Sequence, residues 1–201
     1  GRCDYDAAHL PGAVFVDADR DLVAVAGPGR HPLPSPADFV ACMERIGVGE
    51  DSEVVAYDDA GGTYAVRMWW MLRTMGFTNA AILDGGWEKW EREGRPTSSK
   101  GKPYPPARFT PRPQAGMWAD KHEVLRNIHD PSVCTINALQ PDIYDGQINR
   151  YGRAGHIPGS HNVYYNSLLN PEDGTYLPLD ELRQRFDASG ALGGRTVVYC
   201  G

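Results

Sequence analysis

The chain contains one short motif twice, and this repetition constrains the possible fold more than any other feature of the sequence. The segment AHLPGA around His9 recurs as GHIPGS around His156, so that the two histidines are 147 positions apart. In each copy an amphipathic helix follows the motif, and a strand rich in β-branched residues follows the helix. A motif that repeats together with the elements after it indicates two copies of one folding unit.

The elements around the motif predict an α/β fold. In the first copy Ser35-Pro36 supplies an N-cap and a proline at the first helical position, and the strand covers 53–57. In the second copy the helix follows Pro178 and the strand covers 196–199. Strands that alternate with helices predict that each unit has a mainly parallel sheet flanked by helices. Further helices are expected over 63–75, 119–128 and 141–144, with strands over 80–83 and 133–137.

The two copies of the strand lead to different residues. Asp58 follows the first strand, and Cys200 follows the second one, 142 positions later. Because parallel α/β sheets bind ligands at the carboxyl ends of their strands, Cys200 is a candidate nucleophile. Gly201 would let backbone N–H groups approach a bound anion. The alternative is a cysteine that only fills space, which is the commoner role of a free thiol.

The two histidines of the motif have a simpler interpretation. His9 and His156 both lie beside a Pro-Gly turn, and His9 belongs to the unit that carries Asp58 in place of a cysteine. A residue that is present with and without the nucleophile is expected to be a structural hydrogen-bonding group rather than a catalytic acid or base. The chemistry is therefore assigned to Cys200.

The repeat also predicts how the chain is divided. We expect an N-terminal unit over 1–95 that lacks its first strand, a proline-rich interdomain linker over 96–116, and a C-terminal unit over 117–201. The first unit continues 36 residues past Asp58, whereas one residue follows Cys200, so we expect the second unit to be truncated after its catalytic strand. The 201 residues alone are then expected to be inactive, because a loop and helix that would stabilise a thiolate are missing.

Composition excludes several classes of partner. The formal net charge of −6 argues against a nucleic-acid-binding protein, which needs a basic face. No apolar run approaches the roughly 18 residues that cross a membrane. The four cysteines form no C-x-x-C pair, so we expect no metal site, and free thiols indicate a reducing, cytoplasmic compartment.

Several segments together resemble one known family. The paired AHLPGA and GHIPGS motifs, RMWWMLR at 67–73, LDGGW at 83–87 and the valine-rich strand that ends in Tyr-Cys-Gly are similar to the tandem-domain rhodaneses. That family contains thiosulfate and 3-mercaptopyruvate sulfurtransferases. The resemblance implies an inactive N-terminal unit with Asp58 in place of cysteine, a catalytic Cys200 in the C-terminal unit, and no metal or organic cofactor.

The resemblance also implies a reaction. A sulfane sulfur would move from a small anionic donor, thiosulfate or 3-mercaptopyruvate, to a thiol or cyanide acceptor through a persulfide on Cys200. Gly201 would help to bind the donor. Two alternatives stay open at this point: a phosphatase or arsenate reductase of the rhodanese fold, and a non-catalytic rhodanese module used for binding.

The sequence departs from the family where the donor is bound. Many members carry Asp-x-Arg after the strand that opens the second unit, whereas this chain has Asn137-Ala138-Leu139. Asp145 stands near the place of a second arginine that is usual in the mercaptopyruvate enzymes. We expect Arg150 or Arg153, just before GHIPGS, to bind the anionic donor instead, and the alternative is that both are surface arginines.

Overall fold

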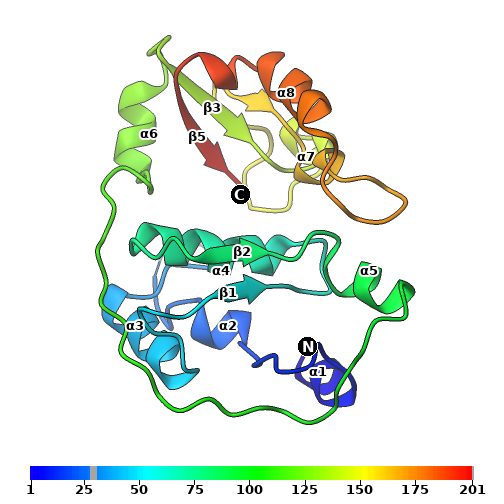
Figure 1. The fold of residues 1–201 in the computed structure, drawn as a ribbon. Helices are drawn as coiled ribbons and strands as arrows, with labels where there is room; N and C mark the ends of the chain where they lie inside the picture. Colours follow the sequence, from blue (N-terminus) through cyan, green and yellow to red (C-terminus); the bar gives the residue numbers. More distant parts are fainter. Residues whose placement is uncertain (28–30, 201) are drawn as a thin grey trace. The chain divides into compact units, whose positions relative to one another are not determined.

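The computed structural model describes residues 1–27 and 31–200 of the chain. They divide into two compact units, Gly1–Ala115 and Gly116–Gly201 (Figure 1). Each unit contains a parallel sheet with helices beside it, which confirms the predicted α/β class. No helix within the described residues is both long and apolar enough to cross a bilayer.

The first unit is built on a two-stranded parallel sheet. Strand β1 (Val54–Ala56) pairs with β2 (Ala80–Ile82) from Val54 opposite Ala80 to Ala56 opposite Ile82. Helix α4 (Thr63–Thr74) connects the two strands and contacts both of them. The remaining helices are α1 (Arg2–Ala7), α2 (Ala18–Asp21), α3 (Pro36–Arg45) and α5 (Gly86–Arg92).

Local sequence explains where the helices of this unit begin and what they bury. The Ser35 hydroxyl accepts a hydrogen bond from the Asp38 N–H at 3.1 Å and so caps α3, as the sequence predicts. The apolar face of α3 places Phe39 and Met43 in the core, where both are fully buried beside Leu72 of α4. Burying each side chain of this size contributes about 2 kcal/mol, which is how the helices are held to the sheet.

The proline-rich segment after α5 packs on the first unit. Ser98 exchanges two backbone hydrogen bonds of 2.8 Å with His9, and the Arg112 N–H donates to the Met75 carbonyl at 2.7 Å. Phe109 is 4% exposed and stacks on Phe77 with ring centroids 5.7 Å apart. By its contacts, the first compact unit spans Gly1–Ala115 and includes this segment.

The second unit has a three-stranded parallel sheet. Its order is β4 (His161–Asn162), β3 (Val133–Asn137) and β5 (Arg195–Tyr199), with β3 in the centre. Ile136, Val163 and Ala191 form the buried cluster of this unit. The helices are α6 (Lys121–Asn127), α7 (Pro141–Tyr144), α8 (Leu179–Asp187) and the 3-10 turns η1 (Tyr165–Leu168) and η2 (Ala191–Gly193).

The strands of the second unit bring their carboxyl ends to one edge. Asn137 lies opposite Asn162 on one side and opposite Tyr199 on the other. The Ala138 N–H, one residue past β3, donates to the Tyr199 carbonyl at 3.0 Å. The chain therefore leaves β5 at an edge that three strand ends share.

Candidate active site at the carboxyl end of strand β5

Cys200 comes directly after β5 and is exposed. Its neighbours on the sheet edge are the residues after β3, because Ala138 bonds to the Tyr199 carbonyl. An exposed thiol at the carboxyl end of a parallel sheet is open to a small ligand. The structure thus places Cys200 where the sequence predicts it, while Gly201 lies outside the described residues.

The other cysteines have different surroundings. Cys42 is 6% exposed, and burial raises the pKa of its thiol. The Cys134 thiol donates to the Ser189 carbonyl at 3.3 Å, and burial raises its pKa as well. A raised pKa leaves less thiolate at neutral pH, so these two thiols are poor nucleophiles. Cys3 is exposed on the short helix α1.

The residues after β3 carry no positive charge toward this edge. Asn137 is 2% exposed, and its side-chain oxygen accepts from the Leu139 N–H at 2.9 Å. The Asn162 amide donates to the backbone carbonyls of Asn137 at 3.1 Å and Leu139 at 2.8 Å. Two asparagines therefore hold the turn that follows β3. Asn162 was missed by sequence reasoning, because its contacts depend on strand order rather than on a local pattern.

Tyr199 connects the end of β5 to the GHIPGS turn. Its phenol oxygen accepts a hydrogen bond from the Ile157 N–H at 3.0 Å and lies 3.0 Å from the Ser160 hydroxyl. The Tyr144 phenol donates to the Ser160 carbonyl at 2.5 Å. Burial raises the pKa of Tyr144, so that its phenol keeps the proton it donates. The turn that carries the repeated motif thereby holds the residue just before Cys200.

His156 supports this turn from the other side. Its ring stacks on the Tyr144 ring, with centroids 3.8 Å apart and planes 7° apart. Its Nδ1 lies 2.8 Å from the Tyr144 carbonyl oxygen, and since a carbonyl only accepts, the imidazole donates. The contacts are those of a structural hydrogen-bonding residue, in agreement with the expectation from the sequence.

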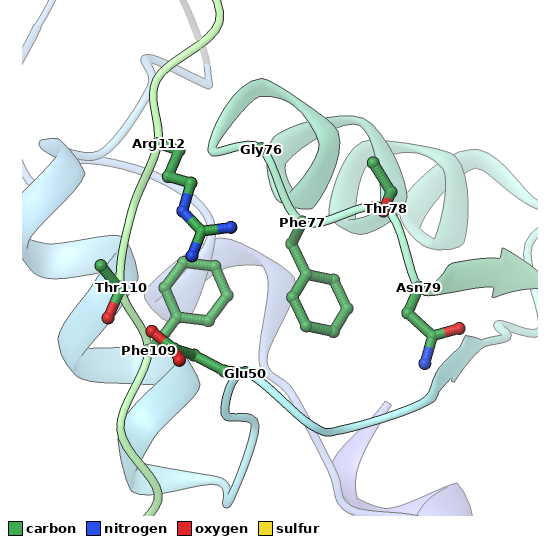
Figure 2. A pocket seen from close by; sticks show the side chains of 8 residues that line it. All are labelled: Glu50, Gly76, Phe77, Thr78, Asn79, Phe109, Thr110 and Arg112. Atoms are coloured by element: carbon green, nitrogen blue, oxygen red, sulfur yellow. The ribbon is translucent and has the colours of Figure 1, made fainter.

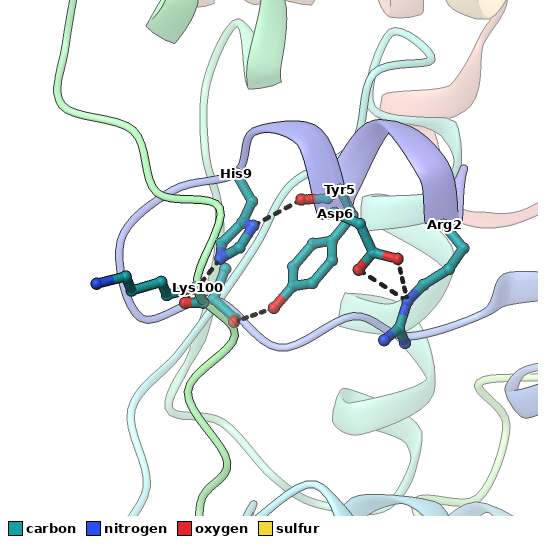
Figure 3. A network of polar contacts seen from close by, with 6 residues as sticks. Arg2, Tyr5, Asp6, His9 and Lys100 are labelled. Atoms are coloured by element: carbon teal, nitrogen blue, oxygen red, sulfur yellow. Dashed lines mark hydrogen bonds and ion pairs between the residues drawn. The ribbon is translucent and has the colours of Figure 1, made fainter.

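The first unit repeats this arrangement around His9. The His9 ring stacks on Tyr5 at 3.9 Å, and its Nδ1 lies 2.6 Å from the Tyr5 carbonyl oxygen (Figure 3). The Tyr5 phenol donates to the Ala13 carbonyl at 2.7 Å, and the Leu10 N–H donates to the Tyr57 phenol at 3.2 Å. The repeat seen in the sequence is therefore also a repeat of side-chain contacts.

Asp58, the counterpart of Cys200, fills a cradle of backbone N–H groups. One carboxylate oxygen accepts from Ala60 at 2.9 Å and from Gly62 at 2.8 Å. The other accepts from Tyr64 at 2.7 Å and from Ala65 at 2.8 Å, in the first turn of α4. Four donors at a helix N-terminus suit an anion, so Asp58 is an internal anion at this place.

Glycine makes this loop possible. Gly62 precedes α4 with φ of 83°, in the left-handed region that side chains other than glycine rarely adopt. A Cβ at Gly62 would meet nothing within 4 Å, so the backbone conformation and not the space requires glycine there. The conformation turns successive N–H groups toward the Asp58 carboxylate.

Arg150 and Arg153 lie in the loop between α7 and β4. Both are exposed, and the Arg150 guanidinium lies 6.0 Å from the centre of the Tyr151 ring. Within residues 1–27 and 31–200, no recorded contact joins either arginine to Cys200 or to an acidic side chain. The loop begins and ends at the Tyr144–His156 stack, so it is attached to the turn that holds Tyr199.

Two cavities lie away from Cys200 and Asp58. One of about 130 Å³ is next to the amino ends of β1 and β2, between Phe77, Phe109 and Arg112 (Figure 2). The other, of about 400 Å³, adjoins the amino ends of β3 and β5 near Cys134 and His129. Among the described residues, no group of three histidine, cysteine or acidic side chains could hold a metal ion.

Comparison with known proteins agrees with this geometry. Residues 2–93 match the family model of the rhodanese-like domain. A probable 3-mercaptopyruvate sulfurtransferase of Pseudomonas aeruginosa is 34% identical over 98% of this chain and 72% of its own length. Thiosulfate sulfurtransferase of Bos taurus is 33% identical over 93% of this chain and 64% of its own length.

A solved structure is similar as well. The crystal structure of SseA from Escherichia coli superposes with a TM-score of 0.88 at 31% identity, covering 98% of this chain and 74% of that one. This chain and SseA thus share their fold, with more than 30% identity along nearly the whole of this chain. The chain therefore belongs to the rhodanese family of sulfurtransferases.

Proposed function

We propose that this protein transfers a sulfane sulfur from thiosulfate or 3-mercaptopyruvate to a thiol or cyanide acceptor through a persulfide on Cys200. The observation that carries the proposal is the exposed thiol at the end of β5, held at a shared sheet edge by Ala138 and Tyr199. The names of the relatives supply the substrate class. The proposal needs neither a metal nor an organic cofactor.

The first half-reaction loads the cysteine. The Cys200 thiolate attacks the outer sulfur of thiosulfate, a sulfur–sulfur bond forms, and the sulfur–sulfur bond of the donor breaks. Sulfite leaves with the electron pair. With 3-mercaptopyruvate the carbon–sulfur bond breaks instead, and the carbon keeps the pair until it is protonated to give pyruvate. Both routes leave the same Cys200 persulfide.

The second half-reaction unloads it. A thiolate or cyanide attacks the outer sulfur of the persulfide, and the Cys200 thiolate leaves with the electron pair of the broken bond. One covalent intermediate thereby divides a difficult transfer into two easier steps. No net oxidation takes place, because the sulfur passes from one nucleophile to another.

The first unit contributes no nucleophile in this proposal. Its equivalent position is a carboxylate whose two oxygens already accept four backbone hydrogen bonds. A carboxylate held in this way is a poor nucleophile for sulfur, and it occupies the place that an anion would take. We therefore assign the chemistry to the Gly116–Gly201 unit alone.

Arg150 and Arg153 are the proposed binding groups for the anionic donor. They are exposed, they lie on a loop whose ends meet at the Tyr144–His156 stack, and that stack is bonded through Ser160 to Tyr199. The tyrosine and histidine of the stack are four positions apart in the first unit and twelve in the second. The longer loop with its two arginines thus belongs to the unit that carries Cys200.

Replacing Cys200 tests the function directly. Cys200→Ser in the full-length protein should abolish thiocyanate formation from thiosulfate and cyanide, because a serine hydroxyl cannot form the persulfide. The matched control is Cys134→Ser, which removes a thiol whose pKa is raised by burial and should keep the activity. Substantial activity in the Cys200→Ser protein would refute the proposed function.

A further inference from the structure

The second unit contains one hydrogen bond that the first unit lacks. The Ser160 hydroxyl lies 3.0 Å from the Tyr199 phenol, whereas the equivalent residue of the first unit is Ala13, which has no hydroxyl. Another contact of the turn occurs in both units: Ile157 and Leu10 each donate their N–H to the tyrosine of the strand. At this position of the motif the two units differ by one side-chain oxygen.

The first unit holds its tyrosine in another way. The Tyr57 ring stacks on Trp87 with centroids 6.5 Å apart and planes 28° apart. The Tyr57 ring is therefore held by ring packing in addition to the hydrogen bond from the Leu10 N–H.

Ser160 is itself held from several sides. It is 6% exposed, its N–H donates to the Ile157 carbonyl at 3.0 Å, and its carbonyl accepts from the Tyr144 phenol. A buried side chain fixed by two backbone bonds has little freedom to move its hydroxyl. The Ser160 hydroxyl is therefore a fixed hydrogen-bond partner for the phenol of Tyr199.

The position of Tyr199 in turn fixes the position from which the chain continues to Cys200. Its backbone carbonyl is bonded to the Ala138 N–H, and its side chain is bonded to the turn through Ile157 and Ser160. The peptide bond after Tyr199 leads directly to the nucleophile. Displacing a reacting group by about 1 Å can lower a rate by up to about 100-fold, so small changes in this anchor should be visible in catalysis.

We propose that Ser160 is a positioning residue for sulfur transfer, which fixes the exit of Cys200 from β5 through its hydrogen bond to Tyr199. This inference rests on the function proposed above. Ser160 acts through Tyr199 and does not touch the donor in this scheme. Its loss should therefore lower the turnover of bound donor more than the binding of donor.

The test compares variants of the full-length protein in thiosulfate:cyanide transfer. Ser160→Ala should lower kcat about tenfold and change KM less than about twofold, because geometry and not binding is altered. Ser160→Thr restores the hydroxyl and should recover most of kcat. Ala13→Ser, the matched change in the first unit, should leave both constants unchanged.

A double-mutant cycle separates the pair from a general effect on the turn. Tyr199→Phe removes the phenol oxygen that bonds to both Ser160 and Ile157, so it should lower kcat at least as much as Ser160→Ala. If Ser160 acts only through the phenol of Tyr199, the double variant should be no slower than Tyr199→Phe alone. Thermal unfolding of each variant checks that the fold is kept. If Ser160→Ala does not fold, the kcat of Tyr199→Phe is compared with that of the wild-type protein instead.

Three results would overturn the inference. Wild-type kcat in Ser160→Ala would show that the hydroxyl has no positioning role. A rise in KM with unchanged kcat would show a binding role instead. Additive losses in the double variant would show two independent effects. A wild-type protein without any sulfur transfer would refute the proposed function itself, and this outcome is seen before any variant is made.

Discussion

At the scale of single residues, the two units differ in the residue that follows β1 in the first unit and β5 in the second. Asp58 and Cys200 stand at equivalent places, but Asp58 accepts four backbone hydrogen bonds from its own loop. A carboxylate in such a cradle caps α4 and neutralises part of its positive end. The residue that removes nucleophilic chemistry from the first unit thus also stabilises that unit.

Asp58→Ala should lower the free energy of unfolding by about 2 kcal/mol, because four N–H groups lose their acceptor and only partly regain one from water. Urea denaturation measures the change. Asp51→Ala removes an exposed carboxylate just before β1 and serves as the control, with an expected change near zero. Equal urea midpoints for the two variants would contradict the capping role of Asp58.

At the scale of elements, the loop between α7 and β4 distinguishes the second unit. The tyrosine–histidine stack has nearly the same geometry in both units, with centroid distances of 3.9 and 3.8 Å. The longer connection in the second unit is therefore accommodated without altering the stack. A loop can lengthen at small entropic cost when its ends are already held together. This leaves Arg150 and Arg153 available for a role in binding.

Replacing both arginines by alanine should raise KM for thiosulfate about tenfold with a smaller change in kcat, because charge-assisted contacts to the donor are lost. Steady-state kinetics with varied thiosulfate measures this. A second double variant, Arg183→Ala with Arg185→Ala on α8, removes two exposed charges from the same unit and is the control for the change in net charge. An unchanged KM in the first double variant would show that Arg150 and Arg153 do not bind the donor.

At the scale of the whole molecule, the proline-rich segment determines where the first unit ends. It brings Phe109 into the core beside Phe39 and Phe77, and its backbone bonds to residues as far back as His9. Prolines favour an extended backbone, but the other residues of the segment still donate N–H groups to the unit. The segment thus packs against the first unit as far as Gln114.

Phe109→Ala should lower the free energy of unfolding of the Gly1–Ala115 unit by about 3 kcal/mol, because the aromatic side chain leaves a cavity in the core. Tryptophan fluorescence during urea denaturation follows this unit through the aromatic residues of α4. Thr110→Ala, the exposed neighbour, is the control. A Phe109→Ala protein as stable as the control would mean that the segment does not hold the unit together.

The sequence by itself determined the repeat, the α/β class and most of the elements. Helix α3, strand β3 and helix α7 lie where local patterns predict them, because capping residues, periodicity and turn signals act within a few positions. The same signals place Cys200 at the end of a strand. The repeat predicts a structural role for His9 and His156, and both imidazoles hydrogen-bond to backbone carbonyls.

Only the tertiary structure decided the contacts that join distant positions. Ser160 and Tyr199 are 39 positions apart, and the Phe109 N–H reaches the Glu44 carboxylate across 65 positions. No local pattern encodes such a meeting, because it depends on strand order and on how the turn packs against the sheet. The hydrogen bonds that anchor Tyr199 beside Cys200 and the four N–H donors around Asp58 were therefore visible only once the chain was folded.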